Sequence, residues 1–219
     1  MEPVPLVRAR KRITGQAKRA EAARKRMREA LLRAATRVFA NRGYRAASIS
    51  DIIAAAGVAR GTFYLYFRGK QDALFAVIDD LREQQKVFIA SHAEQAPNVT
   101  AADLHVQMRQ GFLAWLRFYD ERRDALKILL RESNLIDSKL ERKRAEVRGA
   151  IIDNVSKRIR RLQNTGIYQR KLAPEIVGHF FIGIVDEISL AYLQDDSKPD
   201  LDLLAEQCAT FALDGMLRR

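Results

Sequence analysis

The hydrophobic positions of this chain recur every three or four residues, the spacing that places apolar side chains on one face of a helix. A first helix, from about residue 16 to residue 41, is predicted by an apolar face made of Met27, Leu31, Ala34 and Val38. Gly43 follows it, and glycine often ends a helix because it tolerates the left-handed backbone conformation. The pattern therefore begins with a helix that glycine terminates.

Two short helices are predicted next, and a glycine separates them. A capping box is matched by the sequence SISD at residues 48–51, in which the first serine and the acid satisfy each other's backbone amides. Gly57 ends the helix that starts there, and a second short helix covers about residues 59–63 before Gly69. Two short helices joined by a tight turn form a helix-turn-helix unit.

Longer helices are predicted for the rest of the chain, where no strand pattern competes. Their apolar faces place them at about residues 70–91, 104–119, 124–132, 140–162, 174–194 and 201–217. Gly166 ends the fourth of these, and Pro174 suits the first turn of the fifth because an amide hydrogen is not needed there. The sequence therefore predicts an all-α fold of about nine helices.

Charge is distributed unevenly along the chain. The net charge is +12, yet residues 1–70 hold 17 Lys and Arg against 4 Asp and Glu, a net of +13. Residues 71–219 hold 22 against 23, a net of −1. Such segregation favours a polyanionic partner for the first third of the chain. We expect a flexible basic arm at residues 1–20, a helix-turn-helix DNA-binding domain at 21–70 and a larger ligand-binding and dimerisation domain at 71–219.

Composition argues against several other classes of protein. The first residues lack the apolar run of a signal peptide, and the most apolar later stretch, 176–193, contains two acids that a membrane span would not carry. The single cysteine, Cys208, fits a reducing cytoplasm. The three histidines and this cysteine have no metal-ligand spacing, and no nucleophile–base set is visible. We expect a cytoplasmic protein with no catalytic residue, metal or cofactor.

An anionic membrane surface is the main alternative partner for the basic segment. A helix that binds such a surface needs large apolar residues beside its cations. Residues 8–28 contain few of them, so we expect double-stranded DNA as the partner and no membrane contact.

The second short helix carries residues suited to reading DNA. The major groove admits an α-helix, and an arginine there can pair with guanine through two hydrogen bonds. Arg60 lies at the N-terminal end of this helix, Gly61 allows close backbone approach, and Thr62 offers a hydroxyl and a methyl group. Tyr64 and Tyr66 carry hydroxyls suited to phosphate oxygens.

Flanking positions complete the predicted interface. Lys70 starts the next helix, where its ammonium would add to the positive end of the helix dipole near a phosphate. Phe63 and Phe67 share one helical face and are expected in the core. The predicted DNA-contacting residues are Ser48, Ser50, Arg60, Gly61, Thr62, Tyr64, Leu65, Tyr66 and Lys70.

The same segment carries a family resemblance. Its landmarks are Phe39, Gly43-Tyr44, Asp51-Ile52, Ala56-Gly57-Val58, Gly61-Thr62, Tyr64, Tyr66-Phe67 and Lys70. With them, the sequence VFANRGYRAASISDIIAAAGVARGTFYLYFRGKQDAL resembles the DNA-binding domain of the TetR (tetracycline repressor) family of transcriptional regulators. Ala59 departs from the family pattern, because many members have a serine there that caps the recognition helix. Leu65 also stands where the family often has an aromatic or polar residue.

The resemblance implies a homodimer in which each subunit places one recognition helix in the major groove of a palindromic operator. The larger domain would enclose a small ligand and dimerise through the last two long helices, at about residues 174–194 and 201–217. The helix at about 70–91 would link the pocket to the DNA-binding domain. A repressor that the ligand releases from DNA is the leading hypothesis, and an activator is the alternative. Whether the basic arm contacts DNA is left open.

Two later segments, RESNLIDSKLERKRAEV and FFIGIVDEISLAYLQDD, are similar to TetR-type regulators of fatty-acid metabolism that sense acyl-CoA. They imply a small hydrophobic effector of the fatty acyl-CoA type, and a drug-like hydrophobic ligand is the alternative. Of the adjacent acids Asp186 and Glu187, one is a candidate to set the polarity of the pocket, unless both face solvent. The predicted pocket residues are Met108, Phe112, Trp115, Phe180, Ile184 and Glu187.

Overall fold

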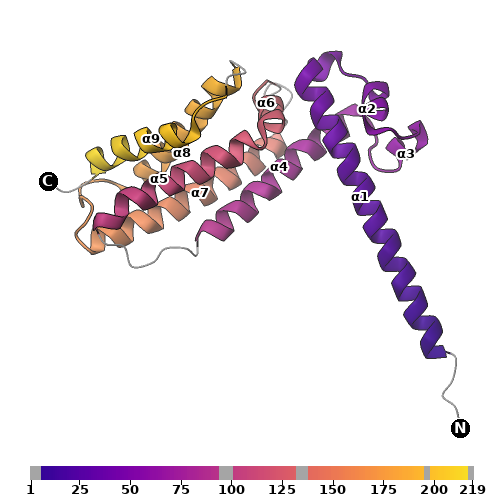
Figure 1. Ribbon diagram of the computed structural model, residues 1–219, viewed down its shortest axis with the longest axis horizontal. Helices are drawn as coiled ribbons and strands as arrows, with labels where there is room; N and C mark the ends of the chain where they lie inside the picture. The colour runs from indigo at the N-terminus through magenta and orange to yellow at the C-terminus, as the bar shows by residue number, and fades with distance from the viewer. Residues whose placement is uncertain (1–5, 94–100, 132–137, 195–197, 217–219) are drawn as a thin grey trace, which may run out of the picture. The chain divides into compact units, whose positions relative to one another are not determined.

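The computed structural model describes residues 6–93, 101–131, 138–194 and 198–216, and in these residues the chain forms nine helices (Figure 1). The predicted all-α fold is confirmed. The helices are α1 (Leu6–Ala46), α2 (Ile49–Ala56), α3 (Arg60–Tyr64), α4 (Lys70–Ala93), α5 (Ala101–Asp120), α6 (Arg123–Arg131), α7 (Ser138–Asn164), α8 (Pro174–Gln194) and α9 (Leu201–Met216).

The chain divides into two compact units, Met1–Ile78 and Asp79–Arg219, and α4 contributes residues to both. In the first unit α1 packs against α2, and α2 against α3. The apolar face predicted for the first helix supplies the core of this unit, because Leu31 and Ala34 are completely buried. Ile52 of α2 and Phe63 of α3 are completely buried with them. The small unit thus has a core to which three helices contribute.

Helix α1 is longer than the sequence pattern predicts. It begins at Leu6, so residues 6–20 are helical where we expected a flexible arm, and residues 1–5 lie outside the described part of the chain. Residues 16–26 are exposed on every side of the helix. Gly43 interrupts the helix with φ 73° and ψ 158°, a combination that residues with a side chain rarely adopt. A last helical turn reaches Ala46 after this interruption.

In the second unit, α5 packs against α8 and α9, and α7 packs against α8. Figure 1 shows these four helices running side by side. The approach of α7 to α8 is close at Gly178, where an added Cβ atom would lie 3.1 Å from the carbonyl oxygen of Ile152. The absence of a side chain at this position therefore sets the spacing of the two helices.

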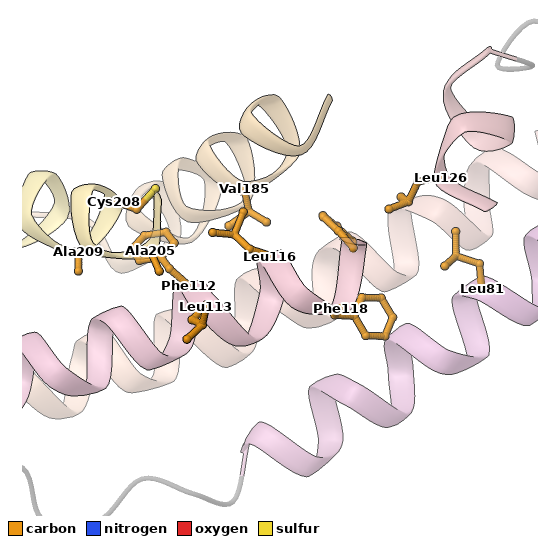
Figure 2. Packing of buried hydrophobic residues seen from close by; sticks show 11 residues of the cluster. Leu81, Phe112, Leu113, Leu116, Phe118, Leu126, Val185, Ala205, Cys208 and Ala209 are labelled. Carbon is orange, nitrogen blue, oxygen red and sulfur yellow. The ribbon is translucent and has the colours of Figure 1, made fainter. Parts of the chain in front are cut away.

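The largest described core of the second unit is centred on α5. Figure 2 shows Phe112, Leu113 and Leu116 of α5 gathered with Val185 of α8 and with residues of α9. Phe112 also stacks on Phe181 of α8, with ring centroids 4.8 Å apart. Because α5 contacts both α8 and α9, it is the element around which the lining of a cavity between these helices is organised.

Candidate DNA-binding surface and effector cavity

The turn between α2 and α3 is fixed by caps that the sequence predicts. The Ser48 hydroxyl accepts a hydrogen bond from the Asp51 backbone N–H at 3.1 Å, and an Asp51 carboxylate oxygen accepts one from the Ser48 N–H at 2.9 Å. At the other end of α2, Gly57 is left-handed with φ 66° and its N–H donates to the Ala54 carbonyl. The predicted capping box and glycine turn are confirmed.

Asp51 also ties α2 to α1. Its carboxylate pairs with the Arg42 guanidinium at 2.7 Å, and the Ser48 hydroxyl donates to it at 2.7 Å. The hydrogen bonds from Ser48, helped by the positive charge of Arg42, lower the pKa of Asp51 below its ordinary value. Arg37 adds a hydrogen bond to the Ala55 carbonyl at the end of α2. The first short helix is therefore held in place by polar contacts with α1 as well as by apolar packing.

Helix α3 separates a buried face from an exposed one. Phe63 and Phe67 are buried, as expected. Arg60 and Gly61 are exposed at the start of the helix, and Thr62 and Tyr66 are half-buried. Tyr64 is 47% exposed and Leu65 74% exposed. The predicted contact residues Ser48 and Ser50 are exposed on the neighbouring helix. The exposed surface of α3 therefore combines the charge of Arg60, the phenol of Tyr64 and the aliphatic side chain of Leu65.

Lys70 has a different environment from the other predicted contact residues. Its ammonium donates hydrogen bonds to the backbone carbonyls of Tyr44 and Ala47, both at 2.8 Å, and to that of Arg45 at 3.3 Å. It also lies 4.4 Å from the centre of the Tyr44 ring. An ammonium has three N–H donors, so this set accounts for all of them. The geometry favours a structural role, in which Lys70 holds the end of α1 against the start of α4.

The recognition helix lacks a side-chain cap. Ala59 occupies the N-cap position with φ −72° and ψ 151°, and no side chain accepts a hydrogen bond from the first amides of α3. The departure noted at Ala59 in the sequence therefore has a structural counterpart: the amides of Gly61 and Thr62, which an N-cap side chain would satisfy, lack a capping hydroxyl.

A cavity of about 1410 Å³ lies in the second unit, between α5, α7, α8 and α9. Ligand sites in proteins usually measure roughly 300–1,000 Å³, so this one could hold a large molecule. All six predicted pocket residues line it: Met108, Phe112, Trp115, Phe180, Ile184 and Glu187. Five of the six are apolar, and aromatic rings from α5 and α8 form much of the wall. His92, near the end of α4, also lines the cavity.

Asp186 and Glu187 have different environments. Glu187 lines the cavity, whereas Asp186 accepts a hydrogen bond from the Tyr119 hydroxyl at 3.0 Å and pairs with Arg148 at 3.2 Å. Burial, together with the charge of Asp186, raises the pKa of Tyr119 well above its ordinary value. Asp186 therefore ties α8 to α5 and α7, and Glu187 is the acid of this pair that faces the cavity.

Three comparisons with known proteins bear on these two sites. A family model for bacterial regulatory proteins of the tetR family matches residues 31–77, which include α2, α3 and the start of α4. The fatty acid metabolism regulator protein of Bacillus subtilis is 25% identical over 187 residues, which cover 85% of this chain and 93% of that protein. The fatty acid degradation regulator FadR from Bacillus halodurans matches with a TM-score of 0.69 and 26% identity, covering 86% of this chain and 95% of that chain.

Residues 31–77 therefore form a DNA-binding domain of the TetR type. The chain is a DNA-binding transcriptional regulator of this type, with similarity to regulators of fatty-acid metabolism and degradation. FadR from Bacillus subtilis, whose structure is a complex with stearoyl-CoA, shares the fold, with a TM-score of 0.66 and 22% identity over 85% of this chain and 98% of that chain.

Several polar residues of this TetR-type regulator line the cavity without a signal in the sequence pattern. Arg158 of α7, Gln107 of α5 and Tyr168 of the segment after α7 are among them. Arg158 and Gln107 are single polar residues within long helices, and Tyr168 follows a helix end. No spacing rule links these positions, so sequence reasoning missed them.

Large apolar side chains are exposed on the last two helices of the regulator. Phe180 of α8 is 64% exposed and Phe211 of α9 is 74% exposed, and both also line the cavity. Ile176 and Leu203 add further exposed apolar surface on the same two helices. Single exposed apolar residues are common, but four on two helices are typical of a surface that another protein covers.

None of the helices that the structure describes is long and apolar enough to cross a membrane. Within the same residues, His, Cys, Asp and Glu side chains form no group of three that could hold a metal ion.

Proposed function

We propose that this TetR-type regulator is a repressor that binds a palindromic operator as a homodimer and leaves the DNA when a fatty acyl-type effector fills its cavity. The observation that carries the proposal is the presence, in one chain, of an exposed α3 surface and an apolar cavity of about 1410 Å³. Because its target is genomic DNA, we place the protein in the bacterial cytoplasm.

The DNA contact is assigned to the exposed residues around α3. Arg60 is placed to reach base edges, and a bidentate pair with guanine discriminates between bases by roughly 1–3 kcal/mol. Tyr64 and Tyr66 would position the protein on phosphates, together with Thr62. Ser50, Gly61 and Leu65 are exposed beside them, while the Ser48 hydroxyl is already engaged with Asp51. We assign Lys70 to holding this surface in place.

The homodimer is assigned to α8 and α9. Their exposed residues Ile176, Phe180, Leu203 and Phe211 would be buried in such an interface. A palindromic operator follows from this symmetry, because a two-fold dimer presents two identical recognition helices to two half-sites.

The effector class is supported by the apolar lining and by the relatives. The cavity is lined by the aromatic rings of Phe112, Trp115 and Phe181, which suit a long hydrocarbon chain. FadR from Bacillus subtilis binds stearoyl-CoA in its solved complex. Helix α4 offers a route for the signal, because it starts with Lys70 in the first unit and carries His92 at the cavity.

Genome-wide mapping of binding sites, followed by gel-shift titration on the recovered operator, tests this proposal. We expect Arg60→Ala to weaken specific binding by about tenfold or more, through loss of the guanine pair, and to leave binding to random DNA within about twofold. Arg19→Ala removes one positive charge from the exposed part of α1 and is the control, which should leave the ratio of specific to random binding unchanged. Stearoyl-CoA at micromolar concentration should release the wild-type protein from its operator.

Two results would contradict the proposal. An equal loss of specific and random binding in Arg60→Ala would remove the base-reading role of Arg60. An operator complex that persists in the presence of acyl-CoA of every chain length would remove the acyl effector and leave a drug-like hydrophobic ligand as the next candidate.

A further inference from the structure

One end of the cavity contains a buried hydroxyl that has no partner in the protein. Tyr168 is 1% exposed and lines the cavity, and its hydroxyl makes no hydrogen bond to any described residue. A buried hydroxyl without a partner costs roughly 1–3 kcal/mol, so such groups are rare in folded proteins. Tyr168 packs with Ile159, Leu162, Leu172 and Val177, which offer no side-chain acceptor, so the cavity is the place from which an acceptor can reach the hydroxyl.

A cation lies near the same end. The Arg158 guanidinium donates one hydrogen bond to the side-chain oxygen of Gln107 at 2.8 Å, and no ion pair among the described residues involves it. Burial and the nearby charge of Arg161 both lower the pKa of Arg158. Arg158 lies next to Ile159 on α7, and Ile159 packs in the same buried cluster as Tyr168, so both polar residues line the same part of the cavity. Burial raises the pKa of Tyr168 to about 12, and the positive charge of Arg158 opposes that rise.

The acids of the cavity do not neutralise this cation. Glu187 and Asp214 are the acidic side chains among the lining residues, both are exposed, and neither is paired with Arg158. A partly buried guanidinium without a carboxylate is unfavourable unless an anion or strong acceptor reaches it. Arg158 therefore resembles Tyr168, because each side chain can donate a hydrogen bond for which the described residues provide no acceptor.

The hydrogen-bond donors of Arg158 and Tyr168 determine which chemical group of a ligand can bind to them. A guanidinium can only donate, and the Tyr168 hydroxyl has a free O–H to donate, so an oxygen acceptor suits both groups. We propose that Arg158 and Tyr168 bind an acceptor-only oxygen group at the end of the apolar effector, the group shared by a fatty carboxylate and an acyl thioester carbonyl. The apolar body of the effector then lies along Phe112, Trp115 and Ile184. This assignment rests on the proposed effector-binding function and adds an orientation to it.

We call the site formed by Arg158 and Tyr168 the anchor. A matched pair of fluorescent probes tests it without any assumption about the identity of the natural effector. The sulfonate 8-anilinonaphthalene-1-sulfonate and the neutral N-phenyl-1-naphthylamine have the same ring system and differ in the acceptor-only group. We expect Arg158→Met to weaken binding of the sulfonate by about tenfold or more, and Tyr168→Phe by about threefold to tenfold. Binding of the neutral probe should stay within about twofold in both variants. Arg161→Met removes an exposed arginine of the same helix and should change neither probe.

Stability provides a second readout. Tyr168→Phe removes only a hydroxyl that has no protein partner, so its thermal midpoint should equal or exceed that of the wild type. An unchanged ratio of sulfonate to neutral-probe affinity in both variants would overturn the anchor. A clear fall in the thermal midpoint of Tyr168→Phe would also overturn it, because the hydroxyl would then serve the fold.

Natural-type ligands then separate the two possible sources of the oxygen group. Palmitate and palmitoyl-CoA are compared with 1-hexadecanol, which has the same chain and can both donate and accept hydrogen bonds. Loss of palmitate binding alone in Arg158→Met identifies a carboxylate, and an equal loss for palmitoyl-CoA identifies the thioester carbonyl. If the probes behave as expected but no acyl compound releases the operator, the anchor stands and the acyl part of the proposed function fails.

Discussion

The two units of this regulator contrast in how their functional residues are held. In the first unit, α2 and α3 are fixed by contacts between residues close in the sequence, such as Ser48 with Asp51 and the amide of Gly57 with the Ala54 carbonyl. In the second unit, the cavity wall is assembled from α5, α7, α8 and α9, so residues such as Met108 and Phe211 are far apart in the chain. The first surface is built locally and the second by tertiary packing.

This difference explains why only one of the two sites has a strong sequence signature. A cap, a tight turn and a short helix each demand particular residue types at fixed spacing, because the backbone needs a hydroxyl, a carboxylate or a left-handed glycine at one place. A cavity wall demands only apolar residues on several helix faces, and many sequences satisfy that condition. The contrast predicts that single substitutions at the polar contacts of the first unit, both the local caps and the longer-range contacts of Lys70, will act on that unit alone.

Lys70→Met gives the largest expected effect. The substitution keeps the aliphatic stem but leaves the carbonyls of Tyr44, Arg45 and Ala47 without their donor. We expect the first unit to lose about 2–3 kcal/mol of unfolding free energy, because hydrogen bonds to a charged group are the strong ones. Hydrogen exchange of the amides in α1 to α3 measures this loss. The fluorescence of Trp115, the single tryptophan, reports the second unit and should show no change.

Arg68→Met is the control for this experiment, because Arg68 is exposed two residues before Lys70. It removes the same charge and should leave amide protection in the first unit unchanged. If Lys70→Met kept the stability of the first unit and weakened DNA binding instead, Lys70 would act on phosphate, as the sequence pattern first suggested.

The two units should lose stability at opposite ends of the pH range. Asp51 has a lowered pKa in the folded protein, so its contribution to the first unit is present above its unfolded pKa and is lost as the pH falls. Tyr119 and Tyr168 have raised pKa values, so their contribution to the second unit is present below about pH 10 and is lost as the pH rises. For Tyr168, with a pKa of about 12, the loss at pH 11 is about 1 kcal/mol.

Urea unfolding at pH 8 and pH 11 measures the alkaline effect. Tyr168→Phe should lose about 1 kcal/mol less than the wild type between these two pH values, because its phenyl ring has no proton to release. An identical loss in the two proteins would mean that Tyr168 ionises in the folded state as easily as in the unfolded chain.

Sequence periodicity predicted the helices well because burial follows it. Leu31, Ala34 and Ile52 lie on the apolar faces that the spacing defined, and all are completely buried. The extension of α1 to Leu6 was missed, because residues 6–15 hold the cations Arg8, Arg10, Lys11 and Arg12 and end in Gly15, a composition that favoured a flexible arm. A helix without a clear apolar face is visible only through intrinsic propensity, which is a weaker signal than periodicity.

Prediction of the two sites from the sequence was limited in a similar way. The exposure of Arg60 and the burial of Phe63 follow from their positions on a short helix, so they could be predicted. The contacts of Lys70 could not, because its partners lie in α1 and the loop after it, more than twenty residues earlier in the chain. The positions of Arg158 and Tyr168 in one cavity could not be predicted either, since they depend on how α7 ends and how the next segment returns to the cavity.

Ala59→Ser gives the smallest expected effect and the sharpest test of the contrast. The N-cap backbone of Ala59 is already extended, with φ −72° and ψ 151°, so a serine hydroxyl could accept a hydrogen bond from the amides of α3 without moving the chain. We expect the first unit to gain about 1 kcal/mol of unfolding free energy, measured by hydrogen exchange of the α3 amides. Ala54→Ser, at an exposed interior position of α2, is the control and should give no gain. Because the cap is a local device, the second unit and its probe affinities should not change. If the serine instead changed operator affinity without changing the stability of the first unit, the hydroxyl missing at position 59 would be a lost DNA contact. Helix capping would then not explain why Ala59 departs from the family pattern.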